Sequence, residues 1–280
     1  MNIVDIRYIE EYLKTFKFLI EDAIKRGGVD EKNKVIRSSK PVNLIHDMVK
    51  KQLIENDVNN VCIFPHIGSS KPEIKIAGWL KQKDQDICAI PMDLEKIYTK
   101  ITWGPLGYSN VYDDYGEDFS EKTLIVNVRS QLSSLAKNTD TLFERTFAEA
   151  LNLHMKYPKA VLGDVYLIPV REYDDDSAKR NIVAFKKKKT KIEQYISFFY
   201  SISNRRNTSS DLFKYERCAL LVVDFCRETP FLYSTLEELK RDGLVSTKFN
   251  VDYSKINFIN FSKDILQEYK NRFGTNHIFS

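Results

Sequence analysis

The chain has 280 residues, of which 42% are hydrophobic, and its 43 basic and 39 acidic residues give a net charge of +4. This balance excludes a polycation that binds nucleic acid through overall charge, so any nucleic-acid surface must be local. No N-terminal signal pattern and no apolar run of about 18 residues is present, which predicts neither secretion nor a membrane-spanning segment.

The first sixty residues contain two helical patterns and no strand. Apolar residues recur at spacings of three and four over residues 9–24, and Gly27-Gly28 predicts the end of this helix. After a polar segment, Pro41 opens a second helical pattern that continues to Leu53. Two amphipathic helices are therefore expected before the first strand.

Short strands are predicted next. Residues 61–64 form an apolar run that ends at Pro65. Residues 73–80 and 85–90 are expected to form a hairpin around the polar turn 81–84, with Asp86 at the start of its second strand. Beyond Pro91, a helix followed by an irregular acidic loop is expected.

The centre of the chain is a strand followed by a long helix. Residues 123–131 alternate so that Asn127, Arg129 and Gln131 share one face, while Val126 and Val128 point to the other. A buried strand of an α/β protein is usually apolar on both faces, so this polar face is either exposed to solvent or lines a site. From position 135 to 155, apolar residues then recur with the period of an amphipathic helix.

The remaining chain predicts more strands and helices. Buried strands are expected at 160–170 and 217–225, a helix at 192–202, and solvated loops at the charge runs 174–176 and 186–189. A helix near 236–240, a strand at 256–261 and a C-terminal helix follow. The prediction is one α/β domain with a mixed central sheet flanked by helices, divided into N-terminal helices (1–60), a core (61–225) and a C-terminal extension (226–280).

The cysteines of this chain show no metal-binding spacing. Cys62, Cys88, Cys218 and Cys226 lie in apolar or strand-like runs, without a Cys-Xaa-Xaa-Cys pair or a Cys/His pattern suited to zinc. Thiols in such positions are typical of proteins in a reducing compartment. We therefore expect four buried free thiols in a cytosolic protein.

The order of helix, hairpin, polar-faced strand, long helix and buried strand over roughly residues 42–225 resembles the nuclease superfamily named for its PD-(D/E)XK signature. Within it, the chain looks like a type II restriction endonuclease. The resemblance implies a restriction-endonuclease-like mixed sheet flanked by helices, in which two carboxylates hold Mg²⁺ against the scissile phosphate. Gln85-Asp86 stands where that family has Pro-Asp, and Asn127-Val128-Arg129 stands where it has (D/E)XK.

The resemblance implies catalytic roles for five residues: Asp86, Asn127, Arg129, Gln131 and Glu144. Asp86 matches the family pattern and is an expected Mg²⁺ ligand. Asn127 and Arg129 depart from it, because an amide binds a hard cation less well than a carboxylate and arginine does not give up its proton. Some family members carry the second carboxylate on the following helix, where Glu144 is the expected second Mg²⁺ ligand and Glu149 the alternative.

Other charged groups are alternatives for the missing lysine or carboxylate: Glu73-Ile74-Lys75, Lys81, Lys83 and the Asp113-Asp114 pair. The Glu-Xaa-Lys tripeptide has no suitable Asp-bearing strand before it, and the two lysines flank Asp86 closely in sequence. Three histidines are expected in the core or on the surface rather than as ligands: His46, His66 and His154.

The function implied by the resemblance is a Mg²⁺-dependent endonuclease that cuts double-stranded DNA at a short sequence in a prokaryotic cytoplasm, with no membrane partner. The alternative is a nuclease-fold DNA-binding protein that has lost its metal chemistry through Asn127 and Arg129. Cutting both strands predicts a two-fold homodimer. The apolar stripe of residues 9–24, or the second helix, is the expected interface, unless that stripe packs on its own domain. Lysines in the run 186–191 are expected to contact phosphates.

Overall fold

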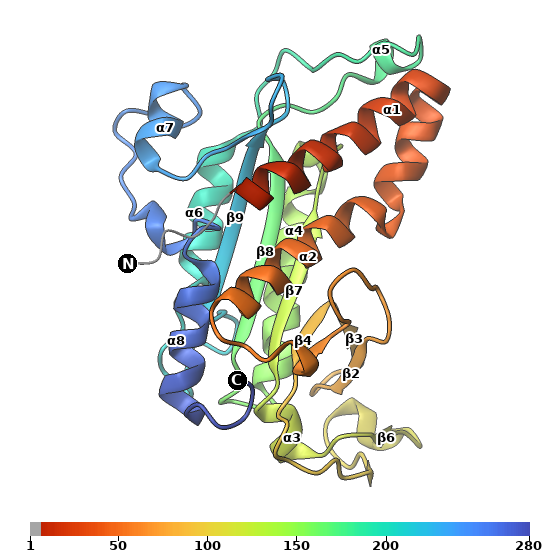
Figure 1. The fold of residues 1–280 in the computed structure, drawn as a ribbon. Coiled ribbons are helices and arrows are strands. Elements are labelled where there is room, and N and C mark those ends of the chain that lie inside the picture. Colours follow the sequence, from red (N-terminus) through yellow and green to blue (C-terminus); the bar gives the residue numbers. More distant parts are fainter. Residues whose placement is uncertain (1–6) are drawn as a thin grey trace.

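The computed structural model describes residues 7–280, and its centre is a mixed sheet of six strands in the order β1-β4-β7-β8-β9-β10 (Figure 1). Its strands are β1 Ile63–Phe64, β4 Ile87–Ala89, β7 Leu124–Ser130, β8 Leu162–Pro169, β9 Arg217–Asp224 and β10 Phe231–Leu232. Strands β7, β8 and β9 run parallel, whereas β4 is antiparallel to β7 and β10 is antiparallel to β9. The predicted α/β class and the mixed central sheet are confirmed.

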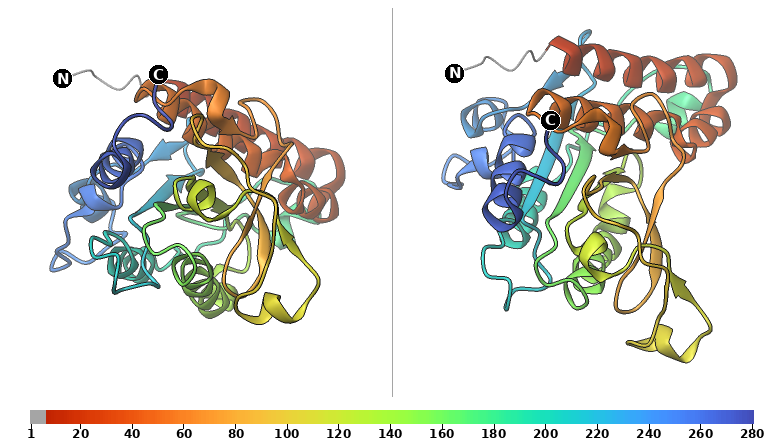
Figure 2. Two further views of the ribbon diagram at one scale, coloured as in Figure 1. Left: turned by 90° about the horizontal axis from the view of Figure 1, so that it is seen from below. Right: turned by 60° about the horizontal axis from the view of Figure 1, so that its bottom comes forward.

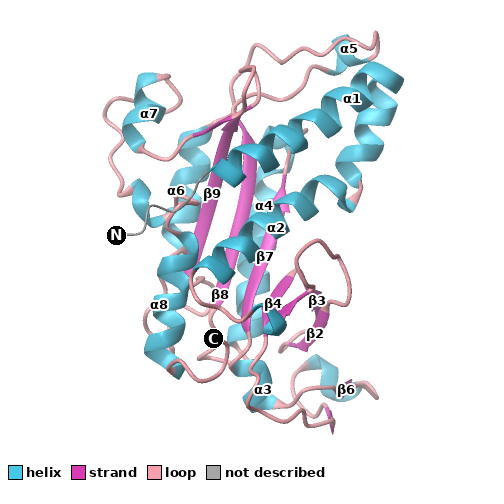
Figure 3. Ribbon diagram, viewed as in Figure 1, coloured by secondary structure: helices cyan, strands magenta, loops and turns pink. Residues whose placement is uncertain are grey.

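Helices cover both faces of this sheet (Figures 2 and 3). One face is packed by α1 Arg7–Arg37, α2 Ser39–Glu55 and α8 Phe261–Phe273, and the other by α4 Leu135–His154 and α6 Ile192–Ile202. Three short helices lie in the connections: α3 Glu117–Glu121, α5 Asp175–Ala178 and α7 Leu236–Arg241. Within residues 7–280, no helix is both long enough and apolar enough to cross a membrane.

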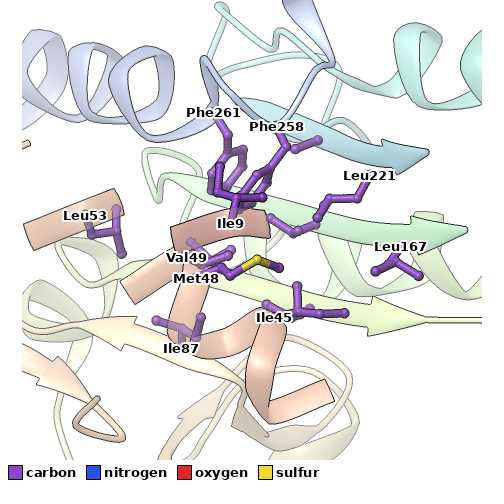
Figure 4. Close-up of a cluster of buried hydrophobic side chains, with 14 of the residues drawn as sticks. Ile9, Ile45, Met48, Val49, Leu53, Ile87, Leu167, Leu221, Phe258 and Phe261 are labelled. Carbon is purple, nitrogen blue, oxygen red and sulfur yellow. The ribbon is translucent and has the colours of Figure 1, made fainter. Parts of the chain in front are cut away.

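The central strands are buried on both faces, as parallel strands between helical layers should be. On β8, Val165 and Leu167 face the α1–α2 layer, and Tyr166 and Ile168 face the α4–α6 layer. Figure 4 shows the first of these cores, where side chains from α1, α2, the sheet and residues 258–261 meet. Gly163 allows α8 to lie close to β8, since a Cβ there would stand 2.7 Å from the Phe261 ring.

The first helix differs from its prediction in two ways. The helical conformation is interrupted at Gly27-Gly28 as predicted, with a φ of +62° at Gly28, but a second helical segment follows directly and continues to Arg37, so α1 consists of two helices joined at a kink. Glycine permits this conformation, and a Cβ at Gly28 would also stand 2.8 Å from the Ala178 carbonyl oxygen. The apolar stripe from Ile9 to Ile24 is buried in the chain's own core, so the expectation that it forms a subunit interface is wrong.

The predicted hairpin exists with a shifted turn. Strand β2 Ile74–Ala77 pairs with β3 Gln82–Gln85, so the turn lies at residues 78–81 rather than 81–84. Asn152 of α4 fixes this turn, because its Oδ1 accepts hydrogen bonds from the backbone N–H groups of Leu80 (2.7 Å) and Lys81 (3.0 Å). The hairpin ends at Asp86, and the chain enters the main sheet at β4.

Three further predictions are corrected. Between Pro91 and α3, where a helix was expected, β5 Thr99–Lys100 and β6 Tyr112–Asp113 form a ribbon that projects from the body (Figures 1 and 2). Residues 256–261 are not a strand in the sheet, because a 3-10 turn precedes them and Phe261 already opens α8. All four cysteines are free as expected, but Cys226 is exposed because it follows the end of β9.

Candidate functional site

Three polar residues stand side by side on neighbouring strands. Ile87 pairs with Val126, which places Asp86, one residue earlier, opposite Asn127 of β7. Asn127 in turn lies opposite Asp164 of β8. Since adjacent strands are about 4.8 Å apart, the row spans about 10 Å between its outer backbones. The Asp86 carboxylate is fixed beside β7 by a 2.8 Å hydrogen bond from the Val128 N–H.

Arg129 lies on the same face of β7 as Asn127 and connects the sheet to α4. Its Nη1 donates to Thr146 Oγ1 at 2.9 Å and lies 3.5 Å from Asp164 Oδ1, while its Nη2 bonds Glu149 Oε2. The second Glu149 oxygen accepts from Lys83 Nζ at 3.0 Å. The polar face predicted for β7 is therefore covered by α4 and lines a group of paired charges.

The pKa values of this group follow from burial and from the charge partners. Burial raises the pKa of Glu149, but Arg129 and Lys83 outweigh it, so the pKa lies below its usual value. Burial lowers the pKa of Arg129, but Asp164, Tyr215 and Glu149 outweigh it, so its pKa is raised. Arg129 and Glu149 are thus both ionised and form an ion pair.

Asp164 is different, because its carboxylate is buried without a hydrogen-bond donor. Neither of its oxygens has a hydrogen-bond partner among residues 7–280, and the same is true of Asn127 Oδ1. Burial raises the pKa of Asp164 to about 6, against the lowering effect of Arg129 and with further raising by Glu149 and Asp86. Buried polar groups are nearly always paired, so these adjacent acceptor oxygens require an explanation.

The donor chemistry of the row fits Mg²⁺. Mg²⁺ takes one or two carboxylates from the protein and completes its shell with water and phosphate oxygens. Asp86 and Asp164 provide two carboxylates, and Asn127 provides an amide oxygen between them. Within the described part of the chain, no group of three or more His, Cys, Asp and Glu side chains is arranged so that it could hold a metal ion, and the row itself contains two carboxylates.

The other predicted site residues are placed as follows. Gln131 lies on the same face as Arg129, and its Oε1 accepts from the Tyr166 hydroxyl at 2.7 Å. Glu144 is exposed on α4. It lies five residues from Glu149, about 140° around the helix, so it does not join the group. Glu149, the alternative, is the helix carboxylate that contacts Arg129.

Of the charged residues that the sequence offered as alternatives, one joins the group around Arg129 and others lie elsewhere. Lys83 joins the group through Glu149. Glu73 pairs with Lys71, and the next residues enter β2, which is not a strand of the main sheet. Asp113 lies on β6 in the projecting ribbon and accepts a hydrogen bond from the Tyr115 N–H.

The histidines and the basic run make contacts within the chain. His154 is buried between the carbonyl oxygens of Leu212 and Ala160, at 3.0 and 3.2 Å. His46 is buried on α2, where burial lowers its pKa and the nearby Asp86 charge opposes that effect. In the run 186–191, Lys186 pairs with Glu172 at 2.7 Å and Lys189 donates to the Asp242 carbonyl oxygen at 2.8 Å.

Sequence reasoning missed Asp164. It treated residues 160–170 as an ordinary buried strand, although one carboxylate stands in the middle of that apolar run. A fully buried aspartate is rare unless it is paired, and this was the available signal. The chain also offers no guide by similarity, since no family model, curated protein or solved structure matches it.

Proposed function

We propose that the protein is a Mg²⁺-dependent endonuclease that hydrolyses phosphodiester bonds of double-stranded DNA at a short sequence, as type II restriction endonucleases do. The observation that carries this proposal is the buried Asp164 carboxylate, whose oxygens accept no hydrogen bond within residues 7–280, beside Asn127 and Asp86. Asn127 stands where the (D/E)XK pattern has a carboxylate. Asp164, directly opposite on β8, supplies the missing one from the neighbouring strand.

The residues of the group have separate roles in this proposal. Asp86 and Asp164 would hold the cation, with Asn127 between them. Mg²⁺ held there would supply the positive charge that lowers the pKa of a water and offsets negative charge on the phosphate. Arg129 stands where the family has a lysine and presents a permanent charge that suits the developing charge on the phosphate. Glu149 and Thr146 orient its guanidinium, and Lys83 balances the remaining charge of Glu149.

A second candidate function is binding of DNA without cleavage. It is favoured by one observation, the ion pair that Arg129 forms with Glu149 together with its position 3.5 Å from Asp164 Oδ1. A guanidinium held there neutralises part of the charge that a cation would otherwise meet. Cleavage assays separate the two functions.

Severing a duplex requires one cut on each antiparallel strand, which a two-fold homodimer places most simply. We include such a dimer in the proposal, through a surface other than the buried stripe of α1. A prokaryotic cytoplasm is the setting that fits this activity.

Incubation of supercoiled plasmid with the purified chain and Mg²⁺ tests the proposal. We expect metal-dependent linearisation, and we expect Asp86→Ala and Asp164→Asn each to lower the rate by about 100-fold or more, because each removes a charge from the metal site. Asp118→Asn, on an exposed carboxylate of α3, serves as the matched control and keeps the wild-type rate. If the protein binds DNA but does not cleave it in the presence of any divalent cation, the second candidate function is established instead. If it does not bind DNA, both functions are excluded.

A further inference from the structure

A groove of about 730 Å³ adjoins the candidate site. One wall is the junction of α1 and α2, with Arg37, Ser38 and Ser39, and the opposite wall is the face of α4 that carries Asn138, Thr141 and Arg145. Arg129 and Gln131, from the end of β7, also line this groove. The groove therefore begins at the group of charges described above and leads away between two helical walls.

The charged residues that line this groove are all basic, and two of them, Arg37 and Arg145, lie outside the Arg129–Glu149 ion pair. Three arginines line it, Arg37, Arg129 and Arg145, and no carboxylate does. Arg37 and Arg145 are exposed, and within residues 7–280 neither forms an ion pair with a carboxylate. A concave surface with one sign of charge attracts and concentrates ions of the opposite sign.

The neutral residues of the groove match a phosphodiester better than an isolated anion. Serine and threonine hydroxyls and the Asn138 amide line the groove together with the arginines, and such groups donate to phosphate and sugar oxygens in protein–DNA complexes. The volume exceeds that of a single phosphate, and the two free arginines stand on opposite walls. A chain of phosphates that passes through the groove meets both of them.

We propose that this groove binds the sugar-phosphate backbone of double-stranded DNA next to the cleaved bond, with phosphates at Arg37 and Arg145. This inference rests on the proposed function, because it places the strand so that it leads to Arg129 and the Asp86–Asp164 row. It also gives the junction of α1 and α2 a role in substrate binding.

Fluorescence anisotropy of a labelled DNA duplex, with the full chain in Ca²⁺ to limit cleavage, measures the contact. We expect the double variant Arg37→Ala/Arg145→Ala to weaken binding at least tenfold and to reduce the slope of log affinity against log salt by about two, one for each lost phosphate contact. Arg145→Lys keeps the charge and should retain most of the affinity. Arg241→Ala, on exposed α7 and away from the groove, is the matched control and should bind as the wild type does.

Two results would overturn the groove assignment: wild-type affinity and salt slope in the double variant, or stronger competition by duplex RNA than by duplex DNA. The melting temperatures of all variants must match that of the wild type, so that a loss of affinity is not caused by unfolding. Arg145→Glu reverses the charge and should lower the DNA affinity more than Arg145→Ala does. The assignment and the proposed nuclease fail separately. If the wild type binds DNA without cleaving it and the double variant loses this binding, the groove assignment is supported and the nuclease is excluded. If the wild type cleaves DNA and the double variant cleaves it at the same rate, the nuclease is supported and the groove assignment is excluded.

Discussion

At the scale of one residue, Asp164 makes folding depend on pH. Burial raises its pKa from 3.8 to about 6, so between these values the folded protein holds a proton that the unfolded chain has lost. The contribution of this group to stability therefore falls as pH rises through that window and stays low above it. A shift of about two units corresponds to roughly 3 kcal/mol.

Asp164→Asn removes this titration while keeping the shape of the protonated side chain. We measure the free energy of unfolding of both proteins in urea. As the pH rises from 4 to 7.5, we expect the difference between them to change by up to about 3 kcal/mol in favour of the variant. At pH 7.5, Ca²⁺ should raise the melting temperature of the wild type and leave that of the variant unchanged, because only the wild type has both carboxylates. Asp118→Asn is the control. A difference between variant and wild type that stays constant with pH would show that Asp164 is not buried as a raised-pKa carboxyl.

Two glutamates of α4 provide a second comparison at this scale. Glu149 is ionised in the folded state because Arg129 and Lys83 hold its pKa below the usual value. Glu149→Gln should lower the free energy of unfolding at pH 7.5 by about 2 kcal/mol, since it leaves Arg129 without its nearest anion. Glu144→Gln, on the exposed face, should change it by less than about 0.5 kcal/mol. Equal shifts of the melting temperature in the two variants would contradict this arrangement.

At the scale of one element, α4 receives its N-terminal cap from a distant part of the chain. Ser134 precedes the helix with a φ of +54° and makes no side-chain cap. The Ser134 and Leu135 N–H groups instead donate to the two Glu172 carboxylate oxygens, at 3.0 and 3.1 Å. A carboxylate at a helix N-terminus is favoured by both hydrogen bonding and the helix dipole. The helix that covers the site is thus fixed to the loop after β8.

Glu172→Ala should cost about 1–2 kcal/mol of stability, the usual effect of losing an N-cap. Urea unfolding followed by circular dichroism measures it, and Glu172→Gln should recover part of the loss because its amide oxygen still accepts a hydrogen bond. Asp176→Ala, on a carboxylate with 84% of its side chain exposed, is the control. No loss in Glu172→Ala would mean that water satisfies these N–H groups equally well.

At the scale of the whole molecule, α1 belongs to the core rather than to an interface. Phe16 is buried and stacks on Phe225 with 5.5 Å between ring centroids, whereas Phe18 of the same helix has 65% of its surface exposed. The sheet, α2 and α8 share this core with α1. The N-terminal helices, the predicted core and the C-terminal extension therefore stabilise one another.

Phe16→Ala should lower the free energy of unfolding by about 3–5 kcal/mol, at any protein concentration, because it leaves a cavity within one chain. Phe18→Ala should change it by less than about 0.5 kcal/mol. Urea unfolding at two protein concentrations, with light scattering of the folded samples, checks both expectations. If the Phe16→Ala protein is as stable as the wild type but changes from dimer to monomer in light scattering, the apolar stripe of α1 would be a subunit interface after all.

The elements that can be predicted from the sequence are those whose pattern is local. The helix of residues 135–155 and the strand that carries Asn127 and Arg129 on one face follow from side-chain periods of 3.6 and 2, which need no knowledge of the rest of the chain. The hairpin was also predicted, but its turn lies three residues earlier than expected, so Asp86 follows the second hairpin strand β3 instead of opening it.

The neighbours of these elements are known only from the folded chain. A period shows which residues share a face, but it does not show which strand is the neighbour or what covers that face. Asp164 lies 37 residues after Asn127 (164 − 127) and reaches it through the β7–β8 pairing. Glu149 contacts Arg129 and Glu144 does not, because of the way α4 is rotated against the sheet. Glu172 caps α4 because the loop after β8 passes the start of that helix. These contacts are set by packing between distant segments, which local patterns do not encode.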